Sequence, residues 1–155
     1  MQHWIRLSLR LAGHEEPRPL LYTQGVVASS EAVTHGIRVE VRSRYLEDRS
    51  RPEENQWLFA YTVRVTNESP RTVQLLSRHW IITDGEGRVE EVRGKGVVGE
   101  QPVLRPGESF EYTSGCPLAT PTGTMQGTYS MSSSEGDVLD VVIAPFALSE
   151  PYAIN

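Results

Sequence analysis

Hydrophobic and polar residues alternate with a period of two along most of the chain after residue 36. Ile37, Val39 and Val41 alternate with charged residues, which is typical of a strand with one face in water. The next stretch places five large residues on one face, and they are Trp57, Phe59, Tyr61, Val63 and Val65. Residues two apart share a side only when the backbone is extended. The pattern therefore predicts strands over residues 37–42 and 57–66.

Turn residues separate this pattern into further strands. The segment from Val73 to Thr83 is apolar on both faces and predicts a central strand. Asp84–Gly87 has residues that tolerate positive φ, so it predicts a hairpin into a strand over 88–93. Arg105–Glu108 holds a Pro-Gly pair and predicts another turn. Alternation then predicts three more strands, over 110–113, 125–132 and 139–143, the last ending before Pro145.

About seven strands, with no amphipathic helix and no internal repeat, predict an all-β protein. Strands at this spacing form a two-sheet antiparallel sandwich of the immunoglobulin/fibronectin type III-like kind. A parallel α/β fold is disfavoured because no segment between the strands is long enough to form a crossover helix.

The first part of the chain lacks this order. Residues 1–33 show no sustained period, and His14–Pro19 is a poor segment for regular structure. We expect a sandwich domain over 33–155, preceded by residues 1–32 as a poorly ordered extension or a mis-assigned start. No methionine lies between Met1 and Met125, so a shorter product would begin at a non-Met codon. The candidates are Val26, Val27 and Val33.

Composition narrows the function classes. The chain has 15 basic and 20 acidic residues, a net charge of −5, which argues against broad binding of nucleic acid or anionic membranes. Cys116 is the only cysteine, so an intramolecular disulfide and a multi-thiolate zinc site are excluded. Charge at Arg6 and Arg10 interrupts the amino-terminal segment, and no stretch is long enough to span a membrane. We expect a cytoplasmic protein.

One glycine-rich segment has candidate chemistry. Gly94, Gly96 and Gly99 match the G-x-G-x-x-G spacing, and Arg93 and Lys95 could add charge to a phosphate contact through exposed backbone N–H groups. The dinucleotide motif also needs a helix after the loop, and residues 101–102 leave no room for one. Two interpretations stay open. In the first, the glycines form a connection between strands that needs positive φ or close backbone packing. In the second, they form an anion or nucleotide site with Arg93 and Lys95.

The remaining reactive residues form no recognisable catalytic or metal set. The four histidines, His3, His14, His35 and His79, include no pair at metal-ligand spacing. Cys116 has no neighbouring histidine in sequence and is expected to be a small buried hydrophobe. We therefore expect no enzyme activity, no cofactor and no metal site.

Five segments resemble the ApaG family closely, in order and at the family's spacing. They are Phe59–Val63, Val73–Trp80, Gly94–Pro102, Pro106–Gly115 and Thr120–Met131. Lys95 departs from the family pattern, in which glutamate is common at this loop position.

The resemblance implies a fibronectin type III-like sandwich without established catalysis. It also implies an association with cobalt and magnesium homeostasis, and a glycine loop for which pyrophosphate or nucleotide binding has been suggested. Related domains in F-box proteins and in a DNA polymerase delta-interacting protein look like protein-interaction modules. The first hypothesis is therefore a protein-interaction module that uses a sheet face or loop surface of a rigid sandwich to bind an unidentified protein partner. Its edge strands can also accept a partner strand or a second copy of the chain. The alternative is a nucleotide or pyrophosphate sensor that uses residues 93–99.

Overall fold

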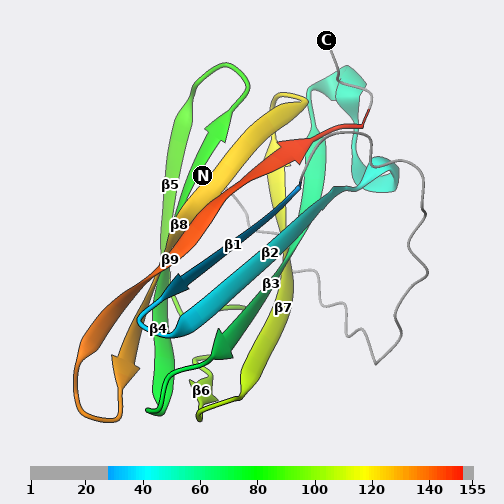
Figure 1. Cartoon of the computed structure of the whole chain (residues 1–155). Coiled ribbons are helices and arrows are strands. Elements are labelled where there is room, and N and C mark those ends of the chain that lie inside the picture. Colours follow the sequence, from blue (N-terminus) through cyan, green and yellow to red (C-terminus); the bar gives the residue numbers. More distant parts are fainter. Residues whose placement is uncertain (1–27, 152–155) are drawn as a thin grey trace.

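The computed structural model describes residues 28–151 and folds them into two antiparallel sheets (Figure 1). The first sheet has the order β1-β2-β3-β7. Its strands are β1 (Ser29–Thr34), β2 (Ile37–Tyr45), β3 (Trp57–Asn67) and β7 (Ser109–Leu118). The second sheet has the order β5-β4-β8-β9. Its strands are β4 (Val73–Asp84), β5 (Val89–Lys95), β8 (Thr122–Ser133) and β9 (Val138–Ser149), and the short β6 (Val103–Leu104) pairs with the start of β4. The all-β, two-sheet prediction is confirmed.

Two of the strands have no counterpart in the prediction. β1 holds few large side chains, and it becomes a strand because it pairs with β2 along its whole length, from Ser29 opposite Arg42 to Thr34 opposite Ile37. The expected domain start at residue 33 falls within this strand, and the expectation for residues 1–27 lies outside the described residues. The other is β6, which has only two residues, too few for a periodic pattern. Two single-turn 3₁₀ helices, Glu47–Arg49 and Pro52–Glu54, connect β2 to β3.

The two sheets bury a core of large side chains that the alternation places on their inner faces. Trp80 lies at its centre, fully buried, with its ring edge-on to Tyr61, Tyr129 and Phe146 at centroid distances of 5.2, 6.3 and 6.0 Å. Such edge-to-face pairs stabilise a core beyond the area that they bury.

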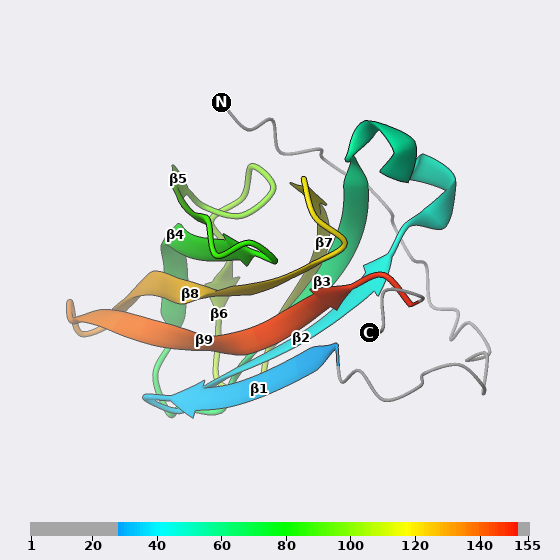
Figure 2. The same ribbon diagram turned by 90° about the horizontal axis from the view of Figure 1, so that it is seen from above.

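The sandwich is closed along one side, where β9 lies beside β1 and β2 (Figure 2). Polar side chains of the first sheet bond to the backbone of β9 there. Ser30 Oγ donates to the Ala144 carbonyl at 2.8 Å, and Ser43 Oγ donates to that of Ala147 at 2.6 Å. The other side lies between β5 and β7, the last strands of their sheets, and we call it the open side.

The end predicted for the last strand, before Pro145, is wrong. β9 continues through Pro145 to Ser149 because the pairing of β8 with β9 shifts register between Met125 and Gly127. Ile143 lies opposite Gly127 and Phe146 opposite Met125, so Pro145 falls at the irregularity. A proline without an N–H is tolerated at such a bulge.

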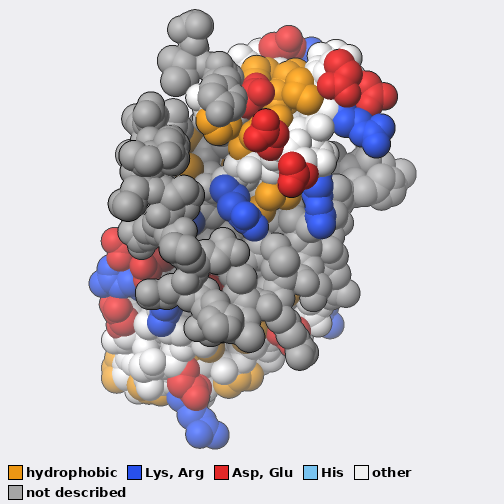
Figure 3. Space-filling view, turned by 90° about the vertical axis from the view of Figure 1, so that its right-hand side faces the viewer, with side chains coloured by type: hydrophobic (Ala, Val, Ile, Leu, Met, Phe, Trp, Pro, Cys, Tyr) orange, Lys and Arg blue, Asp and Glu red, His pale blue; other side chains and the backbone are white. Residues whose placement is uncertain are grey.

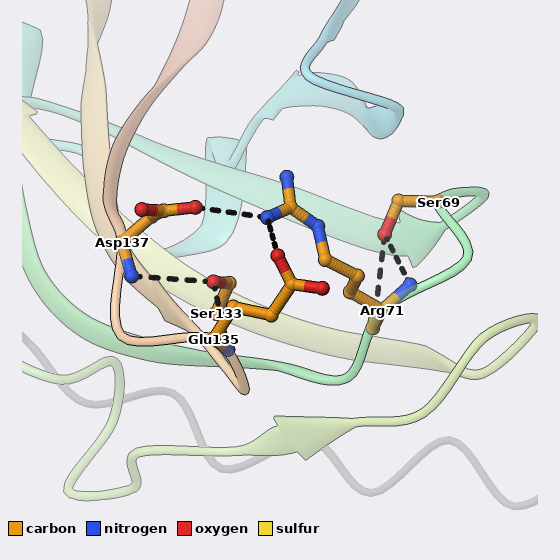
Figure 4. Close-up of polar contacts among 5 residues, drawn as sticks. All are labelled: Ser69, Arg71, Ser133, Glu135 and Asp137. Carbon is orange, nitrogen blue, oxygen red and sulfur yellow. Dashed lines mark hydrogen bonds and ion pairs between the residues drawn. The ribbon is translucent and has the colours of Figure 1, made fainter.

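Surface ion pairs hold the loops at one end of the sandwich. Arg71, in the loop after β3, bonds through Nη1 to Glu135 at 3.0 Å and to Asp137 at 2.9 Å in the β8–β9 hairpin (Figure 4). The two carboxylates raise the pKa of Arg71 further above its ordinary value. Because both acidic partners are well exposed, solvent screens the two pairs and they contribute little to stability.

The described part of the outer face of the first sheet has charged side chains of both signs (Figure 3). They include Arg38 with Glu68 at 2.8 Å and Arg42 with Glu111 at 3.9 Å. No helix in the described chain is long and apolar enough to cross a membrane.

Candidate functional site

Each glycine of the 94–99 motif has a local structural reason. Gly94 lies in β5 opposite Arg78 of β4, and a Cβ at Gly94 would be only 2.7 Å from the guanidinium of Arg78. Gly96 has a φ of +64°, and a Cβ there would be 2.4 Å from the Glu100 carbonyl oxygen. Gly99 has a φ of +82° and forms a tight turn with Val98, whose φ is 43°. Positive φ is readily adopted by glycine and is uncommon for a β-branched residue such as valine.

The backbone of this loop bonds largely to itself and to β4. The N–H of Gly96 donates to the Leu76 carbonyl at 2.8 Å. The N–H of Val97 donates to the Glu100 carbonyl at 2.8 Å, and that of Glu100 returns to the Val97 carbonyl at 2.9 Å. The loop then leads into β6, without a helix. These three N–H groups are therefore committed to internal carbonyls.

Arg78 is an arginine on the inner side of the second sheet. It has the same parity along β4 as the buried residues Trp80 and Ile82, and it pairs across the sheet with buried Tyr129. Its side chain passes over Gly94 toward the open side, where Nη1 donates to the carbonyls of Lys95 at 3.1 Å and Gly96 at 2.8 Å. Within residues 28–151, the hydrogen bonds of this guanidinium involve Nη1 alone. A half-buried cation is thus fixed by two carbonyls while its other donors stay available.

A cavity of about 280 Å³ lies at the open side against this arginine. The first sheet contributes hydroxyl groups to it, and the second sheet contributes cations and the turn after β5. Its lining comprises Tyr61, Tyr112, Ser114, Arg78, Lys95, Val97, Val98 and Gly99. Burial raises the pKa values of Tyr61 and Tyr112 well above their ordinary range, so both hydroxyls stay protonated. Tyr112 also shares a hydrogen bond with the hydroxyl of Tyr129.

A second hollow, of about 480 Å³, lies on the outer face of the second sheet. Its lining combines small hydroxyl side chains with charged ones, and it comprises Ser77, Arg78, His79, Arg93, Gly94, Lys95, Thr128, Ser130 and Asp140. His79 Nε2 lies 2.7 Å from Glu91 Oε1, and Arg93 lies 3.8 Å from the same oxygen. Glu91 therefore offsets part of the positive charge of this hollow.

The structure separates the five residues of the predicted anion site. Arg93, Gly94 and Lys95 line the outer hollow, and Lys95 and Gly99 line the cavity at the open side. Gly96 lines neither. Arg78, which lines both, has no place in the prediction. Its parity with Trp80 is the sequence signal that could have identified it. Charged residues seldom face a core unless they are paired, so an arginine at an inward position indicates a specific role.

The free edge of β5 is the other feature of the open side. Among the described residues β5 pairs with β4 alone. The N–H of Asp84 donates to Arg88 O at 2.9 Å, and that of Gly96 donates to Leu76 O at 2.8 Å, so even-numbered residues bond toward β4. Hydrogen-bonded and non-hydrogen-bonded pairs alternate in an antiparallel ladder. The N–H and C=O groups of Val89, Glu91, Arg93 and Lys95 therefore point away from the sheet.

Two glycine substitutions should distinguish a position where a Cβ would meet backbone, Gly96, from one where it would meet a flexible side chain, Gly94. We expect Gly96→Ala to destabilise the fold by about 2 kcal/mol, because its Cβ meets backbone at a positive φ. We expect less than about 1 kcal/mol for Gly94→Ala, because the flexible end of Arg78 can move aside. Urea unfolding measures both. Equal losses would contradict this account of the loop.

Cys116 is expected to be unreactive in the folded protein. It is fully buried in β7, and burial raises the pKa of its thiol to about 12. The nucleophilic thiolate is therefore scarce at neutral pH and becomes more abundant only as pH rises toward that value. Iodoacetamide at pH 7.5 should label the thiol in urea and leave it unlabelled in native buffer. Rapid labelling of the native protein would contradict the burial.

The chain is similar in sequence and in structure to proteins of a known family. Residues 47–133 match the model of the ApaG domain. The chain is 56% identical over 122 residues to Protein ApaG of Methylobacterium nodulans, covering 79% of this chain and 94% of the relative. It is 58% identical over 120 residues to Protein ApaG of Rhodospirillum centenum, covering 77% and 92%. A crystal structure of an ApaA protein from Bordetella pertussis superposes with a TM-score of 0.73 at 52% identity, covering 83% of this chain and 99% of that one.

Proposed function

Because the chain belongs to the ApaG domain family, we propose that it is a non-catalytic protein-interaction module that binds a partner along the free edge of β5. Strand addition to an exposed sheet edge is a recurrent mode of protein recognition. The backbone of the edge provides affinity, and pockets beside the edge provide specificity.

The observation that carries this proposal is the direction of the backbone groups of β5. Val89, Glu91 and Arg93 direct their N–H and C=O groups away from β4. Lys95 does the same, but its carbonyl already accepts from Arg78 Nη1. The strand is seven residues long. Proteins commonly cover or interrupt such edges, because an open edge invites pairing. The two hollows flank the same strand, one on each face of the sheet.

A proline at position 91 tests the proposal. The N–H of Glu91 points outward, so Glu91→Pro removes a donor that a partner strand needs and keeps the ladder to β4. Glu91→Ala is the matched control, because it loses the same side chain and keeps the donor.

A photo-crosslinking residue at Val89, which is 62% exposed, would first capture the partner for identification and purification. We expect Glu91→Pro to weaken binding of that purified partner at least tenfold, while Glu91→Ala stays within about threefold of the unmodified chain. Equal binding by all three chains would overturn strand addition at β5.

The lining of the outer hollow favours a second candidate, binding of a phosphate-bearing small molecule. The cationic side chains of Arg78, Arg93 and Lys95 line it together with Gly94, and such a convergence of cations attracts anions. This candidate ranks second because three loop N–H groups already bond internally. An amide NMR titration with pyrophosphate separates the two. Saturable shifts at residues 93–99 that Lys95→Ala abolishes would support the sensor, and unchanged amides would dismiss it.

We also propose that the association with cobalt and magnesium homeostasis, implied by the family, operates through the bound partner. The single cysteine of the chain offers few soft ligands for cobalt. Stoichiometric, tight cobalt binding to the isolated chain in calorimetry would contradict this indirect route.

A further inference from the structure

We propose that the strand added to β5 is the β5 of a second copy of the chain, paired antiparallel about Val92. This inference rests on the proposed function, since it names the partner of the same edge. The arrangement is a two-fold dimer in which the second sheets of the two copies become one continuous sheet.

Charge along the outer face of β5 selects this register. Outward-directed backbone groups belong to odd-numbered residues, so only registers that pair odd with odd residues can form hydrogen bonds. Centring the pair on Val92 places Glu91 of each copy opposite Arg93 of the other. The adjacent permitted registers place Glu91 opposite Glu91, or place Arg93 opposite Arg93 between two Glu91–Lys95 pairs, so only the register centred on Val92 has opposite charges without a like-charged pair. Opposite charges directly across a sheet are favourable and like charges are unfavourable.

The same register supplies a partner for Arg78 on the inner face. It places Glu90 of one copy directly opposite Gly94 of the other, at a non-hydrogen-bonded position where side chains approach most closely. Gly94 is the point where the Arg78 guanidinium crosses β5, with Nη1 held by two carbonyls. Glu90 makes no ion pair within residues 28–151. Two symmetric Arg78–Glu90 pairs would therefore form across the dimer.

At the two-fold axis the side chains are apolar. Val92 faces inward, half-buried, and packs against the core of its own copy. Its counterpart would cover the rest of this side chain. Glycine at position 94 leaves room for both the arginine and the incoming glutamate. The inner face thus offers an apolar centre flanked by two charge pairs, and the outer face offers two more.

Two charge reversals test this register with the full-length chain. Glu91→Arg brings two arginines face to face at each outer pair, and Arg93→Glu brings two glutamates face to face there. We expect each variant alone to dimerise at least tenfold more weakly than the unmodified chain, since two pairs per dimer become like-charged. In an equimolar mixture, one variant has arginine at positions 91 and 93 and the other has glutamate at both. Each arginine then faces a glutamate of the other copy, so the mixture should form a heterodimer. Glu111→Arg, an exposed reversal on β7, is the matched control.

Sedimentation velocity over a dilution series, up to the solubility limit, measures the fraction of each sample that is dimeric. Dimers of the unmodified chain and of the mixture, with monomeric single variants, would confirm the register. A monomeric unmodified chain, single variants that still dimerise, or a mixture that stays monomeric would each overturn it. Thermal melts of the variants exclude unfolding as the cause. Strand addition by a different protein would still be detected by the Glu91→Pro experiment, so the failures of the two proposals are distinguishable.

Discussion

Replacing Gly127 with alanine is expected to destabilise the sandwich by about 3 kcal/mol or more, the upper range for overpacking. Gly127 lies in β8 beside Trp80, at the register shift of the second sheet. A Cβ at this position would be 2.0 Å from the carbonyl oxygen of His79 and 3.2 Å from the Cα of Trp80. Both atoms belong to the backbone of the central strand, so relief requires β4 and β8 to move apart. Guanidinium unfolding followed by tryptophan fluorescence measures the loss.

Gly136→Ala is the matched control for this prediction. Gly136 lies in the β8–β9 hairpin with a φ of +90° and open space around its Cβ position. We expect it to cost about 1 kcal/mol, from backbone conformation alone. A loss at Gly127 no larger than the loss at Gly136 would contradict the close approach of the two strands.

The second large effect is expected at Asn67, a fully buried polar residue at the end of β3. Its Nδ2 donates to the carbonyls of Arg71 at 2.7 Å and Leu104 at 2.9 Å. Its Oδ1 accepts from the N–H of Ser69 at 2.9 Å and from the hydroxyl of Ser69 at 2.7 Å. Asn67→Ala leaves several of these groups without partners at a cost of about 1–3 kcal/mol for each buried one, so we expect a total loss of about 3–4 kcal/mol.

Arg71→Ala tests whether this loss comes from the buried amide. The substitution keeps the Arg71 carbonyl that Asn67 binds and removes only the exposed ion pairs to Glu135 and Asp137. We expect it to destabilise the fold much less than Asn67→Ala does, because solvent screens exposed ion pairs. If Asn67→Ala costs no more than Arg71→Ala in the same unfolding experiment, the buried amide is not what holds this loop.

Much of the fold could be predicted from alternation alone. The inward residues of β3 are those of the period-two pattern, with Phe59, Val63 and Val65 fully buried. The Asp84–Gly87 hairpin also lies where its glycines predict it, with the N–H of Gly87 bonded to the carbonyl of Asp84 at 3.1 Å. These elements are predictable because local turn chemistry and side-chain burial favour the same structure.

The remaining features depend on pairing between distant segments. β1 is a strand because β2 lies beside it, and β9 passes through Pro145 because β8 shifts register opposite. The candidate site was only partly predictable for the same reason. The glycine spacing identifies the loop, but the sequence does not show that Arg78, a strand away, passes over Gly94. Nor does the loop spacing show which backbone groups of β5 face outward.

Amide hydrogen exchange along β5, measured by NMR in dilute and in concentrated solutions of the full chain, tests the addition of a second copy's strand most directly. The N–H groups of Glu90, Val92 and Gly94 face β4 and should be protected at every concentration. Those of Glu91 and Arg93 should exchange fast when dilute and become at least tenfold slower as a second copy adds its strand. Exchange at Glu91 and Arg93 that stays fast at every concentration would contradict pairing of a second copy at this edge.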